Sequence, residues 1–148
     1  MDEVIYQISE RISLVSKKFF SLTESQRQLK LEPEKWSKKE ILGHLIDSAQ
    51  TNIRRLIIAQ YQANENTVYN QNIWVNAADY QNYDSEDLGN LWILLNKHFC
   101  IILKNMPTDH YEALIDWGKD EPDLVSVNYM VHDYVVHMDA HIKQMNFN

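Results

Sequence analysis

The stretch EKWSKKEILGHLIDS, residues 34–48, contains the clearest helix start in the sequence and decides its fold class. Ser37 and Glu40 have the S-x-x-E spacing of a capping box, in which each side chain accepts a hydrogen bond from the backbone N–H of the other residue. Trp36 and Ile41 have the spacing of the hydrophobic staple that often accompanies this box. The inward stripe of the predicted helix continues through Leu45, Ser48, Asn52 and Leu56.

Three further amphipathic helices are predicted, because apolar residues recur every three or four positions in residues 2–22, 84–106 and 124–145. Asp84 and Pro107 mark the start and the end of the second of these. The link at residues 108–123 has room for an extended pair. With only 3 Gly and 3 Pro in the chain, four such helices predict an all-α four-helix bundle, one domain spanning residues 1–148. The order of the helices in the bundle stays open.

Residues 64–84 have weak periodicity and many Asn, Gln, Tyr and Trp side chains. A loop of this length is uncommon in a compact domain and is often a binding loop. The alternative is a solvated connection whose aromatic side chains only anchor it to the bundle.

The composition limits the class of protein. A net charge of −7 argues against binding to nucleic acid, which calls for a basic surface. The start of the chain has no signal-peptide pattern, no apolar run approaches the ~18 residues of a membrane span, and Cys100 alone allows no internal disulfide. We therefore expect a cytoplasmic protein that does not enter the membrane.

The segment HMDAH, residues 137–141, places His137 and His141 four residues apart on one helix face. Two imidazoles at this spacing can bind one cation at roughly 2.1 Å each. His44 lies on the inward stripe of residues 38–58 and is the best candidate for a third ligand. Three neutral imidazoles leave coordination positions open, as in catalytic metal sites. The spacing alone fits two solvated histidines equally well, and His44 alone fits an ordinary core histidine.

The remaining candidates near this site are carboxylates. Asp47, three residues after His44, and Asp133, four residues before His137, are placed to orient the two rings, because a ligating imidazole usually donates its second N–H. Both also fit surface carboxylates beside the stripes. The other three histidines are interpreted as structural or surface residues: His98, His110 and His132.

These motifs resemble those of the DinB-like superfamily, most closely its YfiT-type branch of metal-dependent hydrolases, which is related to bacillithiol transferases. The resemblance rests on W-S-x-x-E-x-x-x-H-L-x-D at residues 36–47 and on the final H-x-x-x-H, and it covers nearly the whole chain. It implies a four-helix bundle that binds divalent nickel or zinc through His44, His137 and His141, often as a homodimer. The segment YNQNIW resembles the loop that borders the pocket in this branch, so Tyr69 and Trp74 are the candidates for lining it.

The sequence departs from the family in one place. Relatives commonly have a further histidine next to the second ligand of the final motif or just after it, whereas Ala140 precedes His141 here and Lys143 and Gln144 follow. A proton-transfer role for that additional histidine is therefore not expected.

The predicted function is that of a metal-dependent enzyme acting on a small molecule. Its metal would activate a thiol, giving S-transfer with a low-molecular-weight thiol in detoxification, or a water, giving hydrolysis. Two alternatives remain open at this stage. One is a non-catalytic metal-binding stress-response protein, and the other is a metal-free bundle used only for dimerisation.

Overall fold

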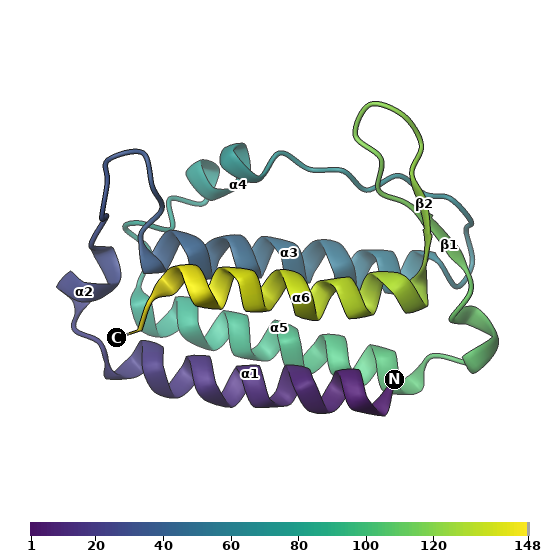
Figure 1. The fold of residues 1–148 in the computed structure, drawn as a ribbon, viewed down its shortest axis with the longest axis horizontal. Coiled ribbons are helices and arrows are strands. Elements are labelled where there is room, and N and C mark those ends of the chain that lie inside the picture. Colours follow the sequence, from purple (N-terminus) through teal and green to yellow (C-terminus); the bar gives the residue numbers. More distant parts are fainter. Residues whose placement is uncertain (148) are drawn as a thin grey trace.

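A computed structural model of the chain describes residues 1–147. Its four long helices are α1 (Asp2–Ser21), α3 (Lys38–Ile58), α5 (Ser85–Asn105) and α6 (Val127–Met145). The smaller elements are the helices α2 (Glu24–Gln28) and α4 (Gln71–Ala77), a 3-10 turn (Thr108–His110), and the strands β1 (Leu114–Asp116) and β2 (Leu124–Ser126). The long helices pack side by side (Figure 1), which confirms the predicted four-helix bundle.

The order of the helices departs from a simple up-and-down bundle. Helices α1 and α6 run in one direction and α3 and α5 in the other (Figure 1). Each of α3 and α1 packs against both α5 and α6. Because α3 and α5 are parallel neighbours, the chain has to return along the whole bundle between them, through residues 59–84. Antiparallel packing of α3 on α6 places the start of α3 beside the end of α6.

Helix α3 is the most enclosed element of the bundle. In α1 the buried side chains form one stripe, as predicted, with Ile8, Ile12 and Phe19 in the core. In α3, by contrast, every residue from Lys39 to Ala49 is buried. The cause is its position, because α3 contacts α5, α6, α4 and α2. A histidine in this part of α3 is therefore removed from bulk solvent.

The helix starts follow the local signals in the sequence. Both hydrogen bonds of the Ser37–Glu40 capping box are present, and the Asp84 side chain accepts from the backbone N–H groups at the start of α5. The predicted start of the last helix at residue 124 is wrong. Residues 124–126 form strand β2, which pairs with β1 in the register Leu114↔Ser126, and α6 begins at Val127. The extended pair expected in the link is thus found, but only β1 lies within residues 108–123, and β2 follows them.

The connection through residues 64–84 is more ordered than the predicted loop. It contains α4, whose first turn is capped by the Asn70 side chain accepting from the Ile73 N–H at 3.2 Å. After α4, the buried Tyr80 ring lies directly on α3. A Cβ atom added at Gly43 would meet the Cδ2 atom of Tyr80 at 2.1 Å. Gly43 thus allows the connection to pack against the turn of α3 that carries the first candidate ligand.

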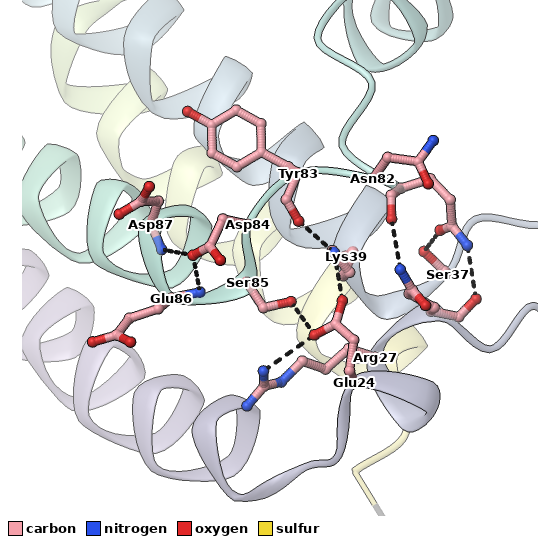
Figure 2. A network of polar contacts seen from close by, with 12 residues as sticks. Glu24, Arg27, Ser37, Lys39, Asn82, Tyr83, Asp84, Ser85, Glu86 and Asp87 are labelled. Carbon is pink, nitrogen blue, oxygen red and sulfur yellow. Dashed lines mark hydrogen bonds and ion pairs between the residues drawn. The ribbon is translucent and has the colours of Figure 1, made fainter.

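A polar network fixes α3 at its N-terminal end (Figure 2). Lys39 is buried, and its ammonium donates to Glu24 at 2.6 Å and to the Tyr83 carbonyl. Glu24 also accepts from the Ser85 hydroxyl at 2.6 Å. These bonds join α2, α3 and the start of α5, and they hold the first turns of α3 in place.

Within residues 1–147, none of the helices combines the length and the apolar content needed to cross a bilayer.

Candidate metal centre

Three histidines meet where the start of α3 crosses the end of α6. The His44 ring lies 5.2 Å from the His137 ring and 4.5 Å from the His141 ring, measured between centroids, and the last two rings are also 4.5 Å apart. One ring nitrogen of each residue lies within 4.8 Å of the other two. The structure therefore brings together all three residues that the sequence singled out as candidate ligands, from segments 93 residues apart.

The spacing of the nitrogens fits a small divalent ion. Nε2 of His44 and Nε2 of His137 are 3.2 Å apart. Two nitrogens bound at about 2.1 Å to a tetrahedral ion would be roughly 3.4 Å apart. Among residues 1–147, no carboxylate, cysteine or further histidine belongs to this cluster. A bound ion would thus have three protein ligands and at least one open position.

The electrostatics of the site favour neutral rings. Burial, with a smaller contribution from the neighbouring histidines, lowers the pKa of His44 to about 3 and that of His137 to about 4. Burial also lowers the pKa of His141, although its hydrogen bond to Gln144 acts in the opposite direction. All three rings are uncharged at neutral pH, which is the form that binds a metal ion.

The outer nitrogens of the rings differ in their partners. Nδ1 of His141 lies 3.0 Å from Oε1 of Gln144. Since an amide oxygen only accepts, Nδ1 carries the proton and Nε2 is left as the ligand atom. In the part of the chain that the structure describes, Nδ1 of His44 and Nδ1 of His137 are buried without a hydrogen-bond partner. The sequence analysis missed Gln144, although its position three residues after His141 on the same helix face was a usable signal.

The two carboxylates predicted to orient the rings have other surroundings in the structure. One oxygen of Asp47 accepts from the Tyr80 hydroxyl at 2.6 Å, and the other is buried with no partner among residues 1–147. Burial raises the pKa of Asp47 to about 6, and the bond from Tyr80 opposes that shift. Asp133 lines a cavity together with Arg55 and His137. Neither carboxylate has a hydrogen bond to a histidine ring in the described chain, so their orienting role stays a prediction.

Aromatic side chains surround the cluster. Tyr69 stacks against His44 with 6.5 Å between centroids, and Trp74 follows at 4.8 Å from Tyr69. These are the two residues expected to line a pocket. Trp36 lies closer still, at 5.1 Å from the His44 ring, although the sequence analysis treated it only as part of a staple. Burial raises the pKa of Tyr69 to about 12, so its hydroxyl keeps its proton at neutral pH.

Two of the histidines line cavities. One has a volume of about 550 Å³ and is lined by His141, Gln144 and Trp36, among others. The other, of about 170 Å³, is lined by His137, Tyr69 and a set of polar side chains from α3. The first cavity thus adjoins His141 and the second adjoins His137, and the two share no lining residue.

The remaining histidines and the cysteine lie outside the site. His98 and His132 are exposed on α5 and α6, and His110 is half-buried in the 3-10 turn. Cys100 is half-buried, and burial raises the pKa of its thiol to about 11, so it is not a reactive nucleophile at neutral pH.

Comparison with solved structures places the fold among known ones. The chain is similar to YfiT from Bacillus subtilis, a probable metal-dependent hydrolase with an unusual four-helix bundle topology, with a TM-score of 0.83 and 18% identity over 97% of this chain and 84% of YfiT. It is also similar to a mycothiol-dependent maleylpyruvate isomerase, with a TM-score of 0.81 and 11% identity over 98% of this chain and 60% of the isomerase. A histidine-to-alanine mutant of the isomerase gives a TM-score of 0.75 at 10% identity.

These similarities confirm the expected DinB-like fold. The chain spans only three fifths of the isomerase, so the activity of that whole protein does not transfer with the fold. No family model matches the sequence, and no curated protein matches it either.

Proposed function

We propose that the protein is a metal-dependent enzyme that transfers a small thiol to an electrophile, with His44, His137 and His141 as the metal ligands. The observation that carries this proposal is the convergence of three neutral imidazoles with no fourth ligand from residues 1–147. A divalent ion such as zinc or nickel, when bound there, would lower the pKa of a thiol or water that reaches it.

The surrounding residues support this chemistry. Gln144 holds the proton of His141 on Nδ1, which leaves Nε2 for the ion. The rings of Trp36 and Tyr69 cover His44 and keep bulk water from it. Because the histidines adjoin two cavities, a thiol and an electrophile can each occupy one, whereas hydrolysis needs only one organic molecule. Among proteins that share the fold, YfiT is a probable metal-dependent hydrolase and the isomerase is mycothiol-dependent, which supports the use of a metal and of a thiol.

The finer properties belong to the same proposal. We expect zinc or nickel as the ion, a low-molecular-weight thiol as the cofactor, a cytoplasmic location and a homodimer. The net charge of −7 makes a nucleic-acid partner unfavourable.

The test is an assay of thiol transfer on the zinc-loaded and nickel-loaded chain, with glutathione, cysteine or other small thiols and monochlorobimane as the electrophile. We expect a metal-dependent rate that falls at least ~100-fold in His44→Ala, since loss of one of three ligands removes the ion. His98→Ala, an exposed histidine on α5, is the matched control and should keep the rate. A metal-loaded chain no faster than the metal-free chain with thiols and with ester substrates would refute an enzymatic role.

A further inference from the structure

Arg55 is half-buried and forms no ion pair within residues 1–147, although the more distant Asp133 carboxylate attracts its charge. Within residues 1–147, no carboxylate lies within 4.0 Å of its guanidinium. The other three arginines of the chain form ion pairs, Arg11 with Asp139, Arg27 with Glu24 and Arg54 with Glu65. Removing a guanidinium from water is costly unless an anion or several hydrogen bonds compensate. Arg55 is therefore the arginine of this chain that most needs a partner.

The protein uses only part of the hydrogen-bonding capacity of Arg55. Its Nε donates to the Thr67 hydroxyl at 2.7 Å, Nη2 to the Thr67 carbonyl at 3.2 Å, and Nη1 to the Asn52 side chain at 3.1 Å. A guanidinium has five N–H groups, so these three bonds leave one N–H on each terminal nitrogen. Two such groups in one plane match the two oxygens of a carboxylate.

The position of Arg55 connects it to the metal centre. Arg55 and His137 line the same cavity of about 170 Å³, and Ser48 and Asn52 of α3 also line it. The Asn52 amide donates to the Ser48 carbonyl and accepts from Arg55, so its orientation is fixed. A volume of this size equals five or six water molecules at about 30 Å³ each. It suits a small organic molecule that reaches from the guanidinium to the histidines.

We propose that this cavity binds a small carboxylate, held by Arg55 at one end with its reacting group at the histidines. The inference rests on the proposed function, since it gives the chemical class of one of the two molecules that the enzyme acts on. Asp133 lines the same cavity. Its negative charge repels a doubly charged group such as phosphate more strongly than a single carboxylate, which favours a monocarboxylate as the ligand. Arg55 is thus a binding residue for the substrate or its thiol partner.

The test uses butyrate and its neutral isostere butyramide as probes of the full chain, as purified and zinc-loaded. Binding is followed by NMR through the Arg55 Nε–H and the indole N–H of Trp117, whose ring lies 5.9 Å from the guanidinium. We expect butyrate to shift both resonances saturably and butyramide at equal concentration to leave them unchanged. Arg55→Gln should lower the affinity for butyrate at least ~10-fold, since it removes a pair of charge-assisted hydrogen bonds.

Arg54→Gln is the matched control, because Arg54 has the same charge on the neighbouring position but is exposed and paired with Glu65. It should change butyrate affinity less than about twofold. Equal binding of butyramide and butyrate, or equal losses in the Arg54 and Arg55 variants, would overturn the proposal. If Arg55→Gln does not fold, the affinity of Asp133→Asn for butyrate is the test instead. Removing this negative charge should increase the affinity by roughly threefold or more. An unchanged or lower affinity would overturn the proposal.

The two proposals fail in different ways. A chain that prefers butyrate through Arg55 but binds no zinc or nickel refutes the metal-dependent function and leaves the carboxylate site. A chain that binds zinc through the histidines and transfers thiols, but binds butyrate no better than butyramide, refutes the carboxylate site alone.

Discussion

At the histidines, burial and metal binding require the same protonation state. Removing an imidazole from water disfavours its charged form, which is why the pKa values of His44 and His137 are lowered to about 3 and about 4. A metal ion binds the uncharged form. At neutral pH no imidazolium of the enclosed cluster therefore has to lose its charge before an ion binds.

Asp47 shows the cost of the same enclosure for an acid. Burial raises its pKa from 3.8 to about 6, so the folded metal-free protein holds the Asp47 proton more tightly than the unfolded chain does. Stability is then lost as the pH rises from about 4 through 6. Asp47→Asn should stabilise the metal-free protein by about 1–2 kcal/mol at pH 8 and have little effect below pH 4. Urea unfolding at both pH values measures this.

The control for Asp47 is Asp109→Asn in the exposed 3-10 turn, which should change stability at neither pH. A net destabilisation of Asp47→Asn at pH 8 would mean that the carboxylate is ionised and stabilised in the folded protein, contrary to this interpretation.

Gln144 gives a second prediction at the residue scale. Its side chain fixes the proton of His141 on Nδ1, so Gln144→Ala should weaken zinc binding by about tenfold. The fold should be unaffected, because Gln144 is exposed. Competition with a chromophoric chelator measures the affinity, with the exposed neighbour Lys143→Ala as control. Equal zinc affinity in the Gln144 variant and the wild type would show that this bond does not orient the ligand.

At the scale of elements, the sequence was enough to predict a feature wherever the residues that determine it are neighbours in the chain. The capping box at Ser37 and Glu40 and the cap at Asp84 lie within one turn of the helices that they start, and both are found as predicted. The pair at His137 and His141 is equally local, since its spacing alone puts both rings on one face.

Features that depend on contacts between distant segments were not predictable in this way. The partner of Asp47 is Tyr80, 33 residues later, so the spacing of Asp47 from His44 gave no information about where its carboxylate points. The start of α6 at Val127 depends on the pairing of β2 with β1. The place of Arg55 beside the cavity of His137 likewise depends on how α3 packs against α6.

The contact between α3 and the connection before α5 is tested at Gly43. Alanine is favoured over glycine in a helix by about 1 kcal/mol. Here, however, its Cβ would overlap the Tyr80 ring, at 2.1 Å from Cδ2, and overpacking of this kind costs about 1–3 kcal/mol. Gly43→Ala should therefore destabilise the wild type by thermal or urea unfolding. In a Tyr80→Ala background the same change should be neutral or stabilising. A loss of equal size in both backgrounds would show that Tyr80 does not set the requirement for glycine.

At the scale of the whole molecule, the parallel arrangement of α3 and α5 is what creates the site. The return through residues 59–84, which includes α4, runs along α3 (Figure 1). Its Tyr69 ring stacks on His44, and its Trp74 ring packs against Tyr69. The same topology makes α6 antiparallel to α3. The parallel packing of α3 and α5 thus accounts both for the meeting of the proposed ligands and for the aromatic side chains beside them.

Because its ligands come from both α3 and α6, a bound ion should stabilise the whole bundle. Zinc at 100 times its Kd should contribute about 2.7 kcal/mol, which raises Tm by roughly 5–10 °C in a chain of this length. A chelator should reverse the shift. The shift should be absent in His44→Ala and retained in His98→Ala. An equal shift in both variants would indicate that zinc binds elsewhere on the chain.

The most direct measurement is the metal content per chain, by elemental analysis, of the wild type and of His137→Ala, both purified without a histidine tag. We predict about one zinc or nickel ion per wild-type chain and a loss of most of it in the folded variant. Absence of metal from the wild type even after incubation with zinc and nickel, or equal metal in the two proteins, would contradict a three-histidine centre.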